Sequence, residues 1–138
     1  MKNKLFGAWA RAFCAAAVLF CLAACDSGSG GKFVAVGDNG KMANSSDGVT
    51  WTAVPDSTFG TSNINSIAWV GGKFVAGGYQ GKMVYSSDGV TWTAVGDSTF
   101  GTSNINSIAW GNNKFVAGGW DGKMAYSSDG ENWTGITP

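Results

Sequence analysis

Tyr85-Ser86-Ser87-Asp88-Gly89-Val90-Thr91-Trp92 is the stretch that decides the fold, because near copies of it recur at a fixed spacing and the residues between them recur too. The other copies are Ser45–Trp51 and Ser127–Trp133. The repeat is 41 residues long, and 32 of these 41 positions are identical between residues 32–72 and residues 73–113. Identity at this level does not arise by chance, so the chain is a repeat array.

Each copy contains the residues of a tight turn. Glycine tolerates a positive φ, and the aspartate before it can accept hydrogen bonds from backbone N–H groups further along the turn. A serine two residues before the aspartate can bond the other arm, and the tryptophan can cover the hairpin and pack on a neighbouring sheet. We therefore expect structural roles for twelve residues: Ser45, Asp47, Gly48, Trp51, Ser86, Asp88, Gly89, Trp92, Ser127, Asp129, Gly130 and Trp133.

The pattern Ser-x-Asp-Gly-x-x-Trp resembles the Asp-box of bacterial sialidase-like repeats, also called BNR repeats, in a compact form that lacks one spacer residue. Three copies in register carry this resemblance, which covers residues 32–138. In that family the box lies on the hairpin between the third and fourth strands of a β-propeller blade. The resemblance therefore implies a propeller fold built from such blades.

The residues between the boxes predict an all-β fold. Four short strands are expected in each repeat, and in the third repeat they are residues 104–110, 114–119, 122–127 and 133–136. A four-stranded repeat of this length is typical of propeller blades. We therefore expect a partial β-propeller of four-stranded antiparallel blades, in which Phe59 and Phe100 anchor the links between blades.

The repeat array occupies residues 32–138, as repeats 32–72, 73–113 and 114–138. Because residue 32 begins a second strand, the array supplies about two and two-thirds blades, and the first blade is expected to lack its innermost strand. Closed propellers have about four to eight blades. The sequence therefore indicates a fragment of a longer array, poorly ordered terminal blades, or a homo-oligomer, as a dimer or trimer, that closes the propeller.

Residues 1–24 have the pattern of a lipoprotein signal peptide. Three cations precede an apolar run, residues 12–24, which is shorter than the roughly 20 residues of a membrane-spanning helix. The run ends in Leu22-Ala23-Ala24-Cys25, which resembles a bacterial lipobox and implies cleavage before a lipidated Cys25. We expect a signal helix over residues 1–24 and a Gly/Ser tether over residues 25–31. An ordinary cleaved signal is the alternative.

A lipid on Cys25 would anchor the chain to a membrane of the bacterial cell envelope. The choice between the inner and the outer membrane, and exposure at the cell surface, stays open. Residues 25–138 contain six lysines, no arginine and no histidine against nine acids, which gives a net charge of −3. Nucleic-acid binding needs clustered lysine and arginine, so we expect no nucleic-acid partner.

Residue types argue against an enzyme. Sialidase chemistry in the family needs an arginine cluster, a tyrosine nucleophile with a glutamate, and an aspartate acid. The only arginine is Arg11, in the predicted signal, and the only glutamate is Glu131, in the last box. Without histidine the sequence offers no Ser-His pair and no zinc cluster, so we expect no catalytic residue, no cofactor and no metal. The alternative is a fragment of a sialidase-like glycoside hydrolase whose catalytic blades are missing.

Differences between the repeats fall at the tip of the hairpin between the second and third strands. The second repeat has Tyr79-Gln80 there, and the third has Trp120-Asp121. An exposed aromatic ring beside an amide or carboxylate suits a sugar ring, which stacks on one face and hydrogen-bonds at its rim. We interpret these four residues as a candidate site for a glycan or protein ligand. The competing interpretation is that loop tips vary because little constrains them.

The sequence as a whole indicates a lipid-anchored protein of the cell envelope that acts as a non-enzymatic binding or scaffolding module.

Overall fold

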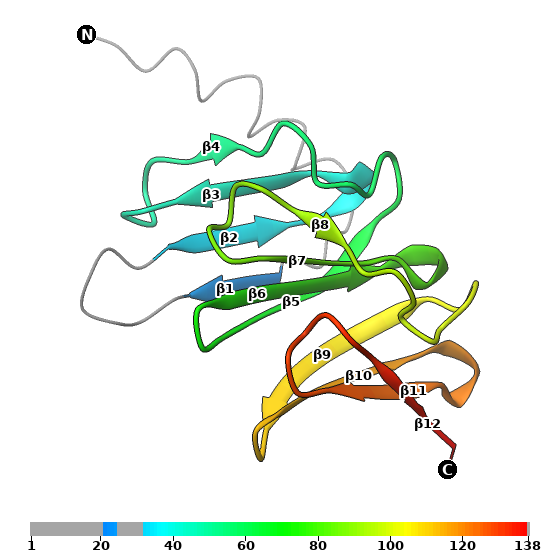
Figure 1. Ribbon diagram of the computed structural model, residues 1–138. Coiled ribbons are helices and arrows are strands. Elements are labelled where there is room, and N and C mark those ends of the chain that lie inside the picture. The colour runs from blue at the N-terminus through cyan, green and yellow to red at the C-terminus, as the bar shows by residue number, and fades with distance from the viewer. Residues whose placement is uncertain (1–20, 25–31, 138) are drawn as a thin grey trace, which may run out of the picture.

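The computed structural model describes residues 21–24 and 32–137, which form three four-stranded antiparallel sheets (Figure 1). Each sheet is an up-and-down meander in which strands adjacent in sequence are paired. Blade 1 consists of β1 (Cys21–Ala24), β2 (Phe33–Val36), β3 (Met42–Ser45) and β4 (Thr52–Ala53). Blade 2 consists of β5 (Ile64–Val70), β6 (Lys73–Gly78), β7 (Met83–Ser86) and β8 (Thr93–Ala94). Blade 3 consists of β9 (Ile105–Gly111), β10 (Lys114–Gly119), β11 (Met124–Ser127) and β12 (Thr134–Ile136).

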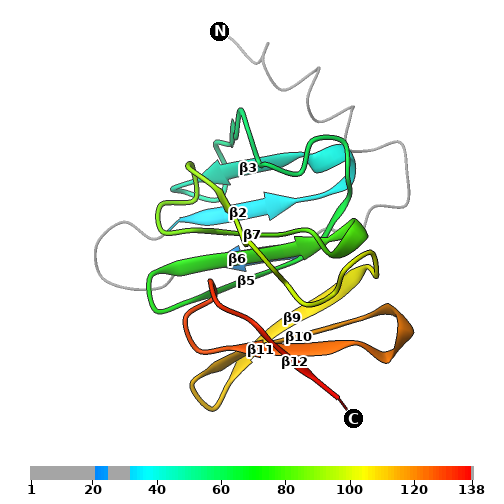
Figure 2. The same cartoon turned by 45° about the vertical axis from the view of Figure 1, so that its right-hand side comes forward.

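This architecture confirms the prediction of an all-β partial propeller with four-stranded antiparallel blades. The blades stack face to face along the chain, and the turned view of Figure 2 shows the same order from β2 through β6 to β10. The innermost strands β1, β5 and β9 contact one another in succession. Each second strand turns into the third through one 3-10 turn, namely η1 (Asp38–Gly40), η2 (Tyr79–Gly81) or η3 (Trp120–Gly122).

The first blade corrects the sequence analysis in one respect, because its sheet has an innermost strand. Strand β1 pairs Cys21 with Val36, whereas in blade 2 the corresponding Gly77 pairs with Ser66. Val36 and Cys25 lie one repeat before Gly77 and Ser66, so the repeat pattern would pair Val36 with Cys25. The observed partner, Cys21, lies four residues earlier in the chain. Residues 25–31 are polar and glycine-rich, so the chain forms the strand from the apolar Cys-Leu-Ala-Ala segment upstream instead.

Strand β1 lies inside the segment that the sequence assigns to a signal peptide. The predicted signal helix over residues 1–24 is wrong for Cys21–Ala24, which form a strand instead. Residues 1–20, the predicted lipid-bearing Cys25 and the tether fall outside the described residues. Cleavage before Cys25 would remove β1 and leave β2 at the edge of the first sheet.

The hydrophobic core lies between the blades, in two clusters. The first joins blades 1 and 2 and includes Val34, Met42, Phe74 and Trp92. The second joins blades 2 and 3 and includes Val75, Met83, Phe115 and Trp133, among others. Because each sheet covers the next, apolar residues occupy both faces of the middle blade, which explains the continuous apolar run in β6.

The links between blades are anchored as the sequence predicts. Phe59 and Phe100 are fully buried, each inside one of the two core clusters. The hydroxyl of Ser57 donates to the Gly40 carbonyl at 2.7 Å, and that of Ser98 donates to the Gly81 carbonyl at 2.6 Å. Each link is therefore fixed both to the core and to the 3-10 turn of the blade that it leaves.

Candidate functional site

The Ser-x-Asp-Gly turns have one hydrogen-bond pattern in all three blades. In blade 2 the Asp88 carboxylate accepts the backbone N–H groups of Val90 and Thr91 at 2.8 and 2.7 Å, and the Ser86 hydroxyl at 3.0 Å. The Ser86 hydroxyl oxygen in turn accepts the Gly89 N–H at 2.8 Å. The same bonds form around Asp47 and around Asp129. The carboxylates thus hold the turns together.

These bonds keep the three carboxylates charged. Backbone N–H groups of its turn, Thr50 first, lower the pKa of Asp47 well below its ordinary value. Hydrogen bonds from the side chain and backbone of Asn132 do the same for the pKa of Asp129. Burial raises the pKa of Asp88, but the backbone bonds of its turn outweigh that effect and bring the pKa to about 2. A carboxylate of this kind is a poor proton donor near neutral pH.

The pKa shifts predict how stability depends on pH. Each carboxylate has a lower pKa in the folded chain than the ordinary 3.8, so its contribution is complete above about pH 4. The contribution is lost as the pH falls below about 4, and for Asp88 the loss is completed as the pH falls through about 2, where its folded carboxylate gains a proton. The midpoint of thermal unfolding, followed by circular dichroism, should therefore fall steeply across this range. The side chain of Asp88→Asn cannot titrate, so this variant should show a weaker dependence of the unfolding midpoint on pH. Asp38→Asn serves as control, because it removes a charge outside the Ser-x-Asp-Gly turns. An unchanged pH dependence in Asp88→Asn would contradict the assignment.

The tryptophans of the turns in blades 2 and 3 pack on the second strands of their own blades. Trp92 lies 6.1 Å from Phe74, and Trp133 lies 6.5 Å from Phe115, measured between ring centroids. The indole N–H groups of Trp51 and Trp133 donate to the glycine carbonyls of their turns, both at 3.2 Å. The N–H of Trp92 is buried and, within the described residues, has no hydrogen-bond partner. Trp92 and Trp133 therefore contribute to the core rather than to a surface site, whereas Trp51 is only partly buried.

The four predicted ligand-binding residues lie at the opposite end of the blades from these turns. Tyr79 and Gln80 stand on η2, and Trp120 and Asp121 stand on η3. A third strand runs from each tip to each Ser-x-Asp-Gly turn, so the two kinds of hairpin must lie at opposite ends. Figure 1 shows the hairpins after β6 and β10 on its right and those after β7 and β11 on its left.

The tips expose aromatic rings on a braced backbone. The exposed fraction is 43% for Tyr79 and 60% for Trp120. Gln80 and Asp121 have φ values of 55° and 59°, and each precedes a glycine with positive φ, as in a tight hairpin turn. The backbone N–H of Gln80 donates to the side-chain oxygen of Asn104 at 3.0 Å, which ties the tip of blade 2 to blade 3. The backbone N–H of Trp120 donates to the Asn104 carbonyl at 2.9 Å, so the backbone that carries each ring is held by hydrogen bonds.

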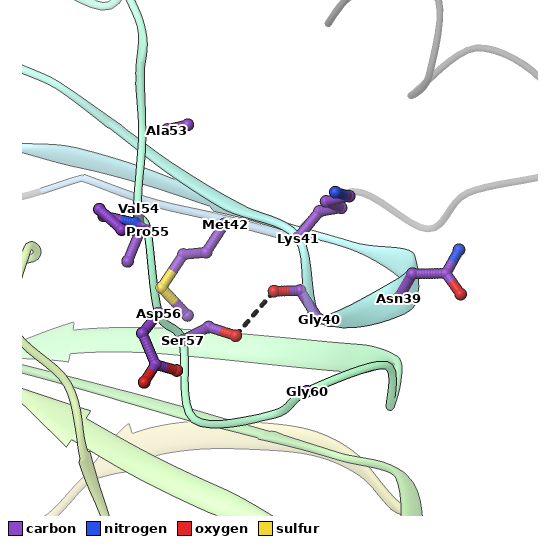
Figure 3. A pocket seen from close by; sticks show the side chains of 10 residues that line it. All are labelled: Asn39, Gly40, Lys41, Met42, Ala53, Val54, Pro55, Asp56, Ser57 and Gly60. Atoms are coloured by element: carbon purple, nitrogen blue, oxygen red, sulfur yellow. Dashed lines mark hydrogen bonds between the residues drawn. The ribbon is translucent and has the colours of Figure 1, made fainter.

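A shallow groove of about 480 Å³ lies beside the tip of blade 1 (Figure 3). It is lined by η1 and by the link to blade 2, with the residues Asn39, Gly40, Lys41, Met42, Ala53, Val54, Pro55, Asp56, Ser57 and Gly60. The bond from Ser57 to Gly40 crosses it. Neither the Tyr79 ring nor the Trp120 ring lines this groove, so the structure does not combine it with the predicted ligand residues.

A second hollow, of about 380 Å³, lies between blades 2 and 3 and was missed in the sequence analysis. Lys73 and Glu131 line it together with Tyr85. Lys73 forms an ion pair with Glu131 and lies 5.3 Å from the centroid of the Tyr85 ring. The two charged residues are 58 positions apart in different repeats, and only the stacking of the blades brings them together. The sequence feature that could have indicated this contact is the lysine that recurs at the same position of each repeat, as Lys32, Lys73 and Lys114.

Within the described residues, no group of three or more His, Cys, Asp or Glu side chains is placed to hold a metal ion. The same part of the chain contains no helix with the length and apolar character needed to cross a membrane.

Comparison with solved structures supports the fold. The chain is similar to YCF48 bound to D1 peptide, with a TM-score of 0.69 and 19% sequence identity over 86% of this chain and 40% of that one. It is also similar to YCF48 from Cyanidioschyzon merolae, with a TM-score of 0.64 and 19% identity over 88% of this chain and 38% of that one. No protein-family model and no curated protein matches the sequence. The chain thus spans about 40% of the length of these β-propeller proteins, and it shares their fold.

Proposed function

We propose that the chain is a non-enzymatic binding module that holds an extended protein segment at the blade ends carrying Tyr79 and Trp120. The observation that carries this proposal is the exposure of these two large rings on braced tips of adjacent blades. Exposed aromatic rings on rigid positions are enriched at interfaces because they bury a large area at a small cost in conformational entropy. The similarity to a propeller protein bound to a peptide supports a peptide as ligand.

A glycan is the second candidate ligand. Each tip pairs its ring with a polar side chain, Tyr79 with Gln80 and Trp120 with Asp121. A sugar ring can stack on the aromatic face while its hydroxyls bond the amide or the carboxylate. The same surface therefore serves both ligands, and the experiment separates them.

The experiment presents the full chain to arrays of extended peptides and of glycans. Replacing both Tyr79 and Trp120 by alanine is expected to weaken binding at least about tenfold, since each ring would act as a binding hot spot. Val49→Ala with Val90→Ala is the matched control, because these side chains are also exposed but lie at the other end of the blades. Binding to peptides alone or to glycans alone identifies the ligand class. Equal binding by both double variants would contradict the site.

The absence of catalytic chemistry is part of the same proposal. Glu131, the only glutamate, forms an ion pair with Lys73 and stays part of the contact between blades. The three aspartates of the turns belong to separate blades, and each is occupied by the bonds of its own turn. The alternative, a fragment of a sialidase-like hydrolase, draws no support from these contacts.

We further propose that Cys25 carries a lipid that anchors this module to a membrane of the cell envelope. The support is the lipobox-like Leu22-Ala23-Ala24-Cys25 and the Gly/Ser-rich residues that follow it. In bacteria grown with a labelled fatty acid, the wild-type chain should take up label and Cys25→Ser should not. Mass spectrometry of the N-terminus then shows whether residues 1–24, with β1, have been removed. Equal label in both proteins would contradict the anchor.

A further inference from the structure

Successive blades are joined by the same contacts, one repeat apart. The Lys32 ammonium donates to the Asp88 backbone carbonyl at 2.8 Å, and the Lys73 ammonium donates to that of Asp129 at 2.7 Å. In each case a lysine at the start of the second strand, or directly before it, reaches the Ser-x-Asp-Gly turn of the next blade. Because the acceptor is a backbone oxygen, the contact does not depend on the side chains of the turn.

A close approach of glycine to valine accompanies each lysine contact. A Cβ atom on Gly89 would lie 3.0 Å from a methyl group of Val34, and one on Gly130 would lie 2.7 Å from a methyl group of Val75. Only a glycine lets the turn come so near to the preceding blade. Gly48, in the turn of blade 1, is exposed, and the atoms nearest to a Cβ there belong to Phe33 of its own blade. The turn of blade 1 could therefore make this contact, but no preceding blade among the described residues occupies it.

Blade 3 presents the other half. Val34 and Val75 are fully buried, but Val116 at the same position of blade 3 is only partly buried. The exposed fraction is 40% for Met124 and 3% for its counterpart Met83. Lys114 is exposed, yet it lies 5.9 Å from the Tyr126 ring, much as Lys73 lies over Tyr85. The strand-side contact residues are thus in place on a surface that none of the three described blades covers.

The innermost strands show the same relation. The Asn65 amide donates to the Ile105 carbonyl at 2.8 Å, and the Ser66 hydroxyl accepts the Ile108 N–H at 2.9 Å, both between blades 2 and 3. Their counterparts Asn106 and Ser107, in β9, are exposed. In both bonds the partner in blade 3 is a backbone group. Any strand supplies such groups, including β1 of another copy.

We propose that the exposed face of blade 3 binds blade 1 of a second copy of this chain, through the contacts that join successive blades. Lys114 then donates to the Asp47 backbone carbonyl of the second copy, and Val116 packs on its Gly48. Two chains joined in this way at both ends make a closed ring of six blades, within the range of about four to eight for propellers. A ring built from the described blades of three chains would have nine blades, which is outside that range.

The ion pair between blades 2 and 3 supplies a specific test. Glu131 pairs with Lys73, and the residue at the same position of blade 1 is Val49. In the proposed dimer Val49 of one copy therefore faces Lys114 of the other. Val49→Glu should recreate the ion pair between the copies and tighten the dimer by up to about fivefold at each interface. The gain should disappear in the double variant with Lys114→Ala.

The experiment measures dimer dissociation by native mass spectrometry of the full chain, made by cell-free synthesis so that residues 1–24 are kept. The wild type should give a species of two 14.2-kDa chains. Val116→Asp should give monomers, and Val90→Glu, which faces Lys32 within one chain, should leave the dimer affinity unchanged. A monomeric wild type, oligomers that grow beyond two chains, or a gain from Val49→Glu that persists with Lys114→Ala would overturn the proposal.

Discussion

Trp92→Ala is expected to lower the free energy of unfolding by about 3–5 kcal/mol. The exposed fraction of Trp92 is only 6%, and its ring lies in the core cluster between blades 1 and 2 beside Phe74. Truncation removes most of a large apolar side chain and leaves a cavity that the neighbouring sheets cannot fill. Domains of this size are stable by about 5–15 kcal/mol, so the loss is a large fraction of the total. Chemical unfolding followed by fluorescence or circular dichroism measures it.

Two conservative variants separate packing from hydrogen bonding. Trp92→Phe keeps a ring in the cluster and removes an N–H group that has no partner in the described structure, so it should cost much less than alanine. Trp133→Phe removes in addition the bond to the Gly130 carbonyl and should cost about 1 kcal/mol more than Trp92→Phe. Equal losses for Trp92→Phe and Trp92→Ala would contradict this separation, because a phenyl ring would then restore none of the stability that the indole provides.

The sequence predicted the blades because the local chemistry of each repeat decides them. A Ser-x-Asp-Gly turn is closed by bonds among neighbouring residues, and the structure forms those bonds in every copy. The predicted strands of the third repeat agree with β9 to β12 within a residue or two at each end. The anchoring of the links was also predictable, since Phe59 and Phe100 are isolated apolar residues in polar segments.

Contacts between repeats could not be read in the same way. The ion pair of Lys73 with Glu131 and the approach of Gly130 to Val75 both depend on how one sheet is placed over the next. Strand β1 escaped prediction for a different reason. It completes the first blade with a segment that does not match the repeat, and its apolar residues served equally well as the end of a signal peptide.

Phe100→Ala is expected to destabilise the chain by about 3–5 kcal/mol, and to do so mainly in blade 3. Phe100 is fully buried in the cluster between blades 2 and 3. Its carbonyl accepts the Ser103 N–H within the link at 3.0 Å and the Lys123 ammonium of blade 3 at 2.8 Å, so the link is tied to blade 3 at this residue. Removal of the ring loosens the link and the cluster together.

The distribution of the damage is the informative result. In a repeat protein each unit contacts only its neighbours, so the loss of one interface should first release the unit beyond it. Amide hydrogen exchange in Phe100→Ala should therefore accelerate in β9–β12 far more than in β2 and β3, which the first cluster still holds. Phe59→Ala, the same change one repeat earlier, should instead accelerate exchange in blade 1. Equal acceleration in all blades of both variants would show that the array unfolds as one cooperative unit, in which each anchor stabilises every sheet and not just the pair that it joins.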